Sequence, residues 1–306
     1  MFFETEDKLR IYFNCCNYKW IEGGYIRYLH FGYKIPYLRY KRICTITELC
    51  FMKNETTNKR LALVTGANQG VGFQVAKELV AAGHTVLLAS RNHEKGLEAA
   101  KAIGEGATAI QLDVTDQASV TAAAALIQDQ FGYLDLLVNN AAISNTQKGE
   151  LSLQDYAKIS QASNISLDEM RAIWETNVFG VLAVYQAMLP LIRKSKDGRI
   201  VNVSSGVGSL TLNADPAFPY RGVFGPGYAA SKTALNAISL AMMIELENTG
   251  IKVNLVSPGF TSTALNGFEG TESVEDGSRE VVRVALFGPE EPSGTFTRWE
   301  NENIPW

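Results

Sequence analysis

Two side chains that can exchange protons, Tyr228 and Lys232, lie four residues apart where a helical stretch begins that runs to about residue 248. Residues at this spacing share one face of a helix, one turn apart. A free tyrosine has a pKa of about 10, and a nearby cation lowers that pKa because it favours the phenolate. The pair therefore predicts a tyrosine that acts as a general acid or base. The spacing alone is common by chance, and an ordinary surface pair is the alternative.

Two neighbouring hydroxyl groups, Ser204 and Ser205, follow the apolar run 198–203. A hydroxyl can donate a hydrogen bond to a carbonyl oxygen and stabilise the charge that develops there as hydride adds to the carbon. Residue type alone does not distinguish the two serines, so either one could donate this hydrogen bond to a substrate.

A glycine-rich turn, Gly66-Ala67-Asn68-Gln69-Gly70-Val71-Gly72, separates the apolar run 60–65 from an amphipathic stretch that ends at Gly83. The order strand, glycine loop and helix lets backbone approach a pyrophosphate, which meets the positive end of the helix. The spacing is Gly-x3-Gly-x-Gly rather than Gly-x-Gly-x-x-Gly, and a purely structural turn is the alternative. Bounded by a strand and a helix, the loop predicts a nucleotide phosphate site.

Arg91 follows the apolar run 85–89 and lies 19 residues after Gly72. Dinucleotide folds that prefer NAD usually place an acidic residue about 20 positions after the glycine loop, where it binds the ribose 2′-hydroxyl. A guanidinium at this place can instead pair with a 2′-phosphate. The sequence therefore favours NADP(H) as the cofactor, with a solvated surface arginine as the alternative.

The elements that must position these residues alternate along the chain. Separated strands and helices imply a parallel sheet with right-handed crossovers, so we expect an α/β fold with a single Rossmann-type, doubly wound sheet of about seven strands flanked by helices. Ligands bind outside the carboxyl ends of such strands. Gly66, Arg91, Asp113 and Asn140 all fall at those ends. The remaining strands are expected at 108–112, 134–139, 198–203, 251–256 and 295–299, with helices at 93–103 and 117–131.

Taken together, these motifs resemble the short-chain dehydrogenase/reductase family. The resemblance covers residues 59–306, is nearest to the carbonyl-reductase-like branch, and rests on Thr65-Gly66-x3-Gly70-x-Gly72, Asn139-Asn140-Ala141, Asn177, Ser205, Tyr228-x3-Lys232 and Pro258-Gly259. It implies an NADPH-dependent enzyme that reduces a ketone or aldehyde, or oxidises an alcohol in the reverse direction.

The resemblance also implies roles for single residues. Tyr228 would be the proton donor or acceptor, and Lys232 would hold the nicotinamide ribose and lower the pKa of the tyrosine. Ser205 would orient the carbonyl. Asn177, on the fourth helix, would anchor a water in a proton relay.

Further residues of the same family pattern imply a cofactor site. Asp113, with Val114 beside it, would contact the adenine, and Asn140 and Ala141 would line the cofactor. Pro258, Gly259 and Thr261 would close over the nicotinamide amide and the diphosphate, and Asn68 and Gln69 would lie near the adenosine ribose phosphate. The full expected set is Gly66, Asn68, Gln69, Gly70, Val71, Gly72, Arg91, Asp113, Val114, Asn140, Ala141, Tyr228, Lys232, Pro258, Gly259 and Thr261.

Three departures from the family pattern matter. Ala142 replaces a usual glycine, and Gln69 is neutral where many NADP-preferring relatives are basic, so Arg91 must carry most of the preference. The segments 141–176 and 206–227 are each roughly ten residues longer than is usual. The second, rich in Pro, Gly and aromatic residues, is expected to form part of the substrate wall, with a surface excursion as the alternative. Either insertion could interfere with assembly, so we expect a monomer or a homo-oligomer.

The composition narrows the class of protein. The chain has 306 residues, 46% hydrophobic, with a net charge of −4. A weakly acidic chain argues against nucleic-acid binding, and no apolar run approaches the roughly 20 residues of a membrane helix. The three histidines lack metal-ligand spacing, so no metal is expected. We expect a cytoplasmic enzyme with a small carbonyl or alcohol substrate and neither nucleic-acid nor membrane partners.

The first 51 residues differ from the rest. They hold all 4 cysteines of the chain, 8 basic residues and 5 acidic residues. Their hydrophobic residues follow neither a helical nor an alternating pattern over any length. No secretory signal pattern is present. We expect residues 1–51 to be a non-conforming extension that comes from a gene model extended upstream, with the true start of the protein at Met52. If the segment is translated, we expect it to be disordered. A small accessory element and a segment with a specific binding function are the alternatives. The functional domain would then span 52–306.

Two other functions fit the same motifs. A non-catalytic NADP-sensing protein is one alternative, although such sensors generally tolerate loss of the tyrosine or lysine. A lyase or epimerase that uses transient hydride transfer is the other.

Overall fold

The computed structural model describes residues 59–147 and 153–306. Lys59–Trp306 forms one compact unit. The expectations for residues 1–51, including a start at Met52, lie outside the described residues.

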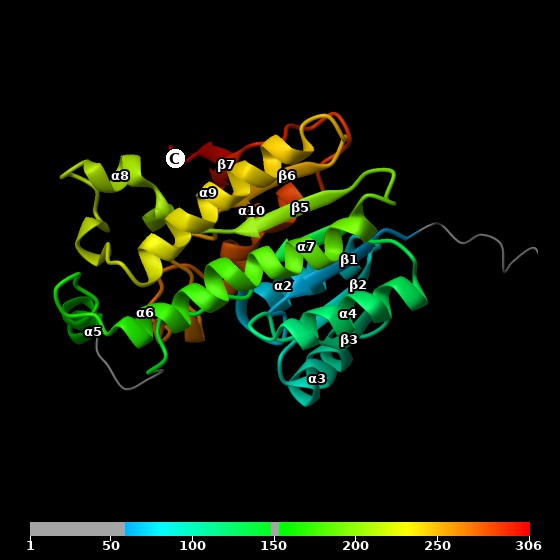
Figure 1. Cartoon of the computed structure of the whole chain (residues 1–306), viewed down its shortest axis with the longest axis horizontal. Coiled ribbons are helices and arrows are strands. Elements are labelled where there is room, and N and C mark those ends of the chain that lie inside the picture. The colour runs from blue at the N-terminus through cyan, green and yellow to red at the C-terminus, as the bar shows by residue number, and fades with distance from the viewer. Residues whose placement is uncertain (1–58, 148–152) are drawn as a thin grey trace, which may run out of the picture. The chain divides into compact units, whose positions relative to one another are not determined.

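One sheet of eight strands runs through the described chain, in the order β3-β2-β1-β4-β5-β6-β7-β8 (Figure 1). The first seven pair in parallel, which confirms the expected doubly wound sheet. The eighth strand pairs antiparallel with β7 and was not expected, because two exposed residues carry no periodic pattern. The strands are β1 Leu61–Thr65, β2 Thr85–Ser90, β3 Ala107–Gln111, β4 Leu136–Asn139, β5 Arg199–Val203, β6 Lys252–Val256, β7 Phe296–Arg298 and β8 Glu302–Asn303.

Helices cover both faces of the sheet. In Figure 1, α4, α7 and α9 cross the side nearest the viewer, while α2 and α10 lie behind the sheet. The helices are α2 Gly70–Ala81, α3 His93–Ile103, α4 Gln117–Gln130, α5 Leu153–Ile159, α6 Leu167–Trp174, α7 Gly180–Ile192, α8 Leu210–Ala214, α9 Tyr228–Leu246 and α10 Val274–Ala285.

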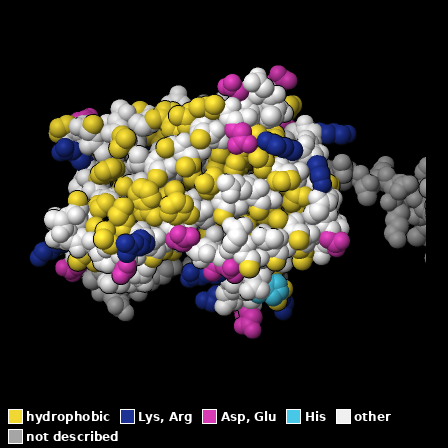
Figure 2. Space-filling view, viewed as in Figure 1, with side chains coloured by type: hydrophobic (Ala, Val, Ile, Leu, Met, Phe, Trp, Pro, Cys, Tyr) yellow, Lys and Arg dark blue, Asp and Glu magenta, His cyan; other side chains and the backbone are white. Residues whose placement is uncertain are grey.

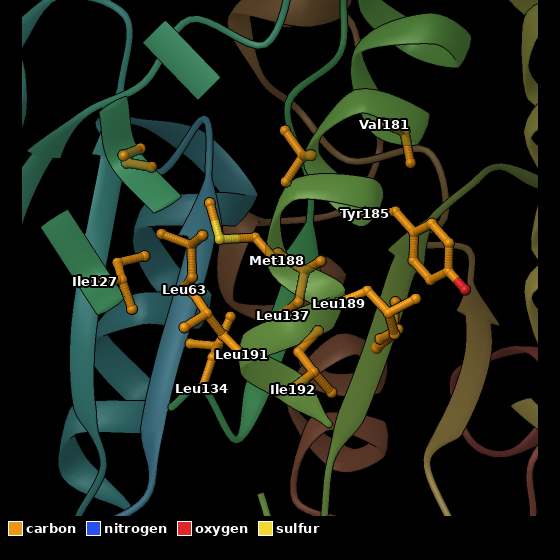
Figure 3. Packing of buried hydrophobic residues seen from close by; sticks show 14 of the residues in the cluster. Leu63, Ile127, Leu134, Leu137, Val181, Tyr185, Met188, Leu189, Leu191 and Ile192 are labelled. Carbon is orange, nitrogen blue, oxygen red and sulfur yellow. The ribbon is translucent and has the colours of Figure 1, made fainter. Parts of the chain in front are cut away.

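The two helical layers follow from the alternation of side chains along buried strands. Leu61 and Leu63 of β1 face the cluster formed with α4, α7 and α9. Figure 3 shows part of this cluster, with Leu63, Leu137 and Met188 packed together. Ala62 and Val64 face the opposite cluster, which α2 and α10 complete. Every residue of β1 is buried, so both faces of the central strand are covered.

A five-residue π-helical turn, Glu175–Phe179, joins α6 to α7. The sequence predicts a helix here, and the structure places Asn177 in the π turn rather than in a regular helix. Among the described residues, one helical stretch, Leu167–Ile192, is long and apolar enough to cross a membrane, and 56% of its most apolar window is buried inside the domain. A core helix of a globular domain passes the same test.

Apolar side chains gather on the face over α7 and α9 (Figure 2). Exposed apolar residues of these helices and of the preceding π turn include Phe179, Leu240 and Ile244. An exposed apolar patch is typical of a contact surface. Such a patch is compatible with a homo-oligomer. The oligomeric state, a monomer or a homo-oligomer, stays a prediction.

Candidate active site

The residues selected from the sequence meet at one edge of the sheet. Strands β1 to β6 are mutually parallel, so their carboxyl ends share that edge. The glycine loop follows β1, Arg91 follows β2, and Asn140 follows β4. Ser205 comes two residues after β5, and Pro258 comes two residues after β6.

The glycine loop fits a pyrophosphate. Gly66 and Gly70 have φ of +63° and +58°, which side-chain-bearing residues rarely adopt. A Cβ on Gly72 would lie 2.3 Å from Asn140 Nδ2 and 2.7 Å from the Gly66 carbonyl oxygen, so only glycine fits. The helix α2 has no side-chain cap at Gln69 and no acidic residue in its first turn. Its first N–H groups and the positive end of its dipole are therefore left for an anion.

Asn140 holds this loop in place. Its Nδ2 donates to the carbonyl oxygens of Thr65 at 2.9 Å and Gly66 at 3.2 Å. The backbone N–H groups of Asn140 and Ala141 both donate to Thr65 Oγ1, at 3.0 and 3.1 Å. The amide of Asn140 thus positions the loop, and its expected place along the cofactor stays a prediction.

The residues expected around the adenosine half are set along the same edge. Arg91 is exposed and forms no ion pair with any described residue. Asp113 Oδ1 accepts hydrogen bonds from the N–H and the hydroxyl of Thr115, at 3.0 and 2.7 Å. Val114 is buried against Gly180, where a Cβ would lie 2.9 Å from the valine Cγ2.

Tyr228 is the first residue of α9, and Lys232 lies one turn further along the helix. The Lys232 side chain is buried, and its Nζ donates to the Val203 carbonyl oxygen at 2.8 Å. Nζ also lies 5.7 Å from the centre of the Tyr228 ring. Burial penalises the ammonium form and lowers the pKa of Lys232 to about 7. This is a packed pair at a sheet edge rather than a solvated surface pair.

The structure separates the two serines. Ser204 is buried, and its Oγ donates to Asn236 Oδ1 on α9 at 2.5 Å. Ser205 is half-buried, precedes the 3-10 turn Gly206–Gly208, and makes no side-chain cap bond to it. Ser204 therefore fastens β5 to α9, and the substrate-orienting role expected of Ser205 stays a prediction.

Asn177 connects three elements and is fully buried. Its Oδ1 accepts from the Ile143 N–H at 2.9 Å, and its Nδ2 donates to the Ile143 carbonyl oxygen at 2.8 Å and to Ser231 Oγ at 3.0 Å. Ser231 in turn donates to the Tyr228 carbonyl oxygen at 2.6 Å. The asparagine side chain thus ties the segment after β4 to the start of α9.

The loop after β6 approaches the glycine loop. Thr261 is buried and donates through Oγ1 to the Pro258 carbonyl oxygen at 2.7 Å, across Gly259 with its φ of +75°. Thr263 was missed by the sequence reasoning. Its Cγ2 lies 3.5 Å from the position of a Cβ on Gly70, so it faces the phosphate loop. The available signal was the third hydroxyl of the run Thr261-Ser262-Thr263.

The segment 206–227 borders the site on two sides. It forms α8 and the 3-10 turn Arg221–Val223. Its Pro226 carbonyl oxygen accepts from Trp174 Nε1 at 3.0 Å, beside the π turn. On the other side, the rings of Tyr220 and Phe260 lie 6.0 Å apart. These contacts support the expected wall and not a detached surface excursion.

No group of three or more His, Cys, Asp or Glu residues within residues 59–147 and 153–306 is arranged to hold a metal ion.

Several known proteins that this chain resembles are named as dehydrogenases or reductases. The family model described as short chain dehydrogenase matches residues 60–273. The short-chain dehydrogenase anuI of Penicillium roqueforti is 38% identical over 253 residues, covering 79% of this chain and 95% of the relative. Salutaridine reductase of Papaver bracteatum is 30% identical over 298 residues, covering 79% of this chain and 95% of the relative.

Solved structures agree. Salutaridine reductase from Papaver somniferum superposes with a TM-score of 0.66 at 31% identity, covering 78% of this chain and 99% of the other. A carbonyl reductase from chicken fatty liver, described as NADPH bound, has a TM-score of 0.66 at 25% identity and covers 81% of this chain and 99% of the other. The glycine loop, the buried Lys232 beside Tyr228 and these relatives lead to one conclusion: the chain belongs to the short-chain dehydrogenase/reductase family and is an oxidoreductase of carbonyl or CH–OH groups that uses a nicotinamide cofactor.

Proposed function

We propose that the protein is an NADPH-dependent reductase of ketones or aldehydes, and a dehydrogenase of the corresponding alcohols in reverse. The observation that carries the proposal is the buried Lys232, one helical turn from Tyr228 at the edge where the glycine loop lies. An acid–base group and a phosphate-binding loop at one edge suit hydride transfer coupled to proton transfer.

A bound NADPH, held by the glycine loop, would supply the hydride that reduces the carbonyl carbon. Tyr228 gives its phenolic proton to the carbonyl oxygen as that oxygen gains charge, and the phenolate then takes a proton back from solvent. Ser205 donates a hydrogen bond to the same oxygen and stabilises the developing charge. In its protonated form Lys232 favours the phenolate. Because burial lowers the pKa of Lys232 to about 7, this lysine exchanges its own proton near neutrality.

Arg91 supports NADPH over NADH. It is exposed at the end of β2, where its guanidinium can pair with a 2′-phosphate. Gln69 in the glycine loop is neutral. Apart from Lys232, Arg91 is therefore the one basic residue in the predicted cofactor set. The NADPH bound to the chicken carbonyl reductase is consistent with this choice.

The remaining assignments complete the proposal. The domain would span 52–306, the relay water would be held at Asn177, and the cofactor contacts would be those expected from the sequence. The substrate would be a small carbonyl or alcohol compound in the cytoplasm, without nucleic-acid or membrane partners. The protein would be a monomer or a homo-oligomer.

Oxidation of NADPH and of NADH, measured across a panel of ketones and aldehydes, tests the proposal. We expect turnover of at least one carbonyl class, with higher kcat/KM for NADPH than for NADH. Tight NADP(H) binding without turnover of any carbonyl would instead indicate a sensing protein. Turnover without net cofactor consumption would indicate a lyase or epimerase.

A further inference from the structure

A pocket of about 520 Å³ opens within the segment 206–227. Its volume lies in the range of small-molecule sites, roughly 300 to 1,000 Å³. It is lined by residues of α8, of the 3-10 turn Arg221–Val223 and of the chain between and after them: Asn213, Pro216, Phe218, Arg221, Gly222 and Phe224. No residue of the proposed catalytic set lines it.

Arg221 is the one charged residue that lines this pocket. Its Nε donates to the Asn213 carbonyl oxygen at 3.0 Å, which fixes one side of the guanidinium. Asn213 is itself buried, and its Nδ2 donates to the carbonyl oxygens of Val207 at 2.9 Å and Ser209 at 2.7 Å. Arg221 is exposed, and this hydrogen bond attaches its guanidinium to the backbone of a buried residue.

The two terminal nitrogens of Arg221 have no partner among the described residues. No carboxylate of residues 59–147 or 153–306 forms an ion pair with this arginine. A guanidinium fork binds a carboxylate or phosphate through parallel hydrogen bonds. The charge and geometry at this wall thus suit an anionic group.

Three apolar side chains line the same pocket. Pro216, Phe218 and Phe224 lie in its wall together with Arg221, Asn213 and Gly222. Aromatic rings offer a large apolar surface to a ligand that meets a polar group at one end. This combination suits a ligand with an apolar body and an anionic end.

The pocket lies close to the proposed acid–base pair. Phe224 precedes Tyr228 by four residues, so their Cα atoms are at most about 14 Å apart. The Gly225 carbonyl oxygen accepts from the Ala230 N–H in the first turn of α9, at 3.1 Å. The Phe218 ring lies 5.8 Å from that of Tyr220, which contacts Phe260 beside Gly259. One wall of the pocket, at Phe224, therefore lies near the start of α9, where Tyr228 is the first residue.

We propose that the pocket is a substrate subsite in which Arg221 binds a carboxylate at the end of the substrate remote from the reacting carbonyl. Phe218 and Phe224 hold the apolar part between the two ends. The inference rests on the proposed reductase function and names its substrate class: an apolar ketone or aldehyde that carries an anionic group.

A matched series of probes tests the subsite. The acids are ω-(4-acetylphenyl)alkanoic acids whose chains differ in length, and their methyl esters are the neutral partners. The variants are Arg221→Gln, Arg221→Lys and the control Lys101→Gln, which removes the same charge from an exposed position on α3. Both kcat/KM and calorimetric binding to the NADP-saturated protein are measured.

We expect Arg221→Gln to lower kcat/KM for at least one acid by roughly 10- to 100-fold, mainly through KM, because a charge-assisted hydrogen bond is lost. Arg221→Lys keeps the charge but loses the fork, so its loss should be smaller. The esters and the Lys101→Gln control should be unchanged. The subsite is overturned if acid and ester respond alike, or if the acids do not respond.

These measurements separate an error in the subsite from an error in the reductase function. If the wild-type protein reduces the esters but shows no preference that depends on Arg221, the subsite is wrong and the reductase function stands. If it reduces neither acids nor esters, the reductase function is wrong for this class, and the calorimetric comparison of wild type with Arg221→Gln still decides whether Arg221 binds the carboxylate. Circular dichroism confirms that each variant is folded.

Discussion

The Nζ of Lys232 lies 5.7 Å from the centre of the Tyr228 ring and 2.8 Å from the Val203 carbonyl oxygen. The first turn of α9 is thereby fixed against the end of β5. A lysine buried in this way has one backbone acceptor and one aromatic neighbour in place of bulk water. The loss of hydration lowers the stability of the folded state when Lys232 is charged. The short distance to Tyr228 lets that charge favour the phenolate form of the tyrosine.

The pH dependence of stability reports this burial. The pKa of Lys232 is about 7 in the fold and returns to its ordinary value of 10.5 on unfolding. Between these values the unfolded state binds more protons, so the stability of the cofactor-free protein rises with pH in this window. Below about pH 7 the full penalty is present, because both states are charged.

Urea unfolding of wild type and Lys232→Met from pH 6 to 10 measures this contribution. The free energy of unfolding of wild type, relative to the variant, should rise by up to about 1.4 kcal/mol per pH unit between about pH 7 and 10. Parallel pH profiles for the two proteins would show that the lysine is not desolvated.

Replacement of each serine should separate their roles. Ser205→Ala should lower kcat by roughly 10- to 1,000-fold with unchanged stability, because it removes a donor to the reacting oxygen. Ser204→Ala should leave Asn236 Oδ1 without its 2.5 Å donor and cost about 1–3 kcal/mol of stability. Steady-state kinetics and urea unfolding of both variants give the comparison. A larger kinetic loss in Ser204→Ala would reverse the assignment.

Gly72→Ala should abolish cofactor binding and lower stability by about 1–3 kcal/mol. The new methyl group would meet Asn140 Nδ2 and the Gly66 carbonyl oxygen, the two groups that shape the phosphate loop. Gly288→Ala is the control, because nothing lies within 4 Å of its Cβ position. Titration of NADPH into both variants measures the effect, and equal affinities would contradict the loop's proposed role.

Arg91→Asp should shift the cofactor preference toward NADH. The carboxylate repels a 2′-phosphate and can accept a hydrogen bond from the 2′-hydroxyl. The measurement is the ratio of kcat/KM for NADPH to that for NADH, with exposed Lys101→Asp as the control for net charge. An unchanged ratio would remove Arg91 from the cofactor site.

The sheet and the place of the site were predictable because they depend on local patterns. The buried strands β1 and β2 each carry four consecutive apolar residues, and the glycine loop lies between a strand and a helix. Parallel strands then bring their carboxyl ends together without further information. The distinction between Ser204 and Ser205 was not predictable from residue type, because it depends on which hydroxyl meets Asn236 across 32 positions of sequence.

Other features depend on tertiary contacts in the same way. The π turn at Asn177 is held by Ile143 and Ser231, both distant in sequence. The approach of Thr263 to Gly70 exists only once the loop after β6 has folded back. The two-residue β8 is too short for a pattern, since it is defined by its pairing with β7.

The substitution Tyr228→Phe tests whether Tyr228 transfers the proton during carbonyl reduction. Single-turnover reduction of a ketone by the NADPH-loaded protein should slow by at least roughly 100-fold. Cofactor affinity should stay at the wild-type value, because the ring remains beside Lys232. Full single-turnover activity in Tyr228→Phe, with NADPH still bound, would contradict the account.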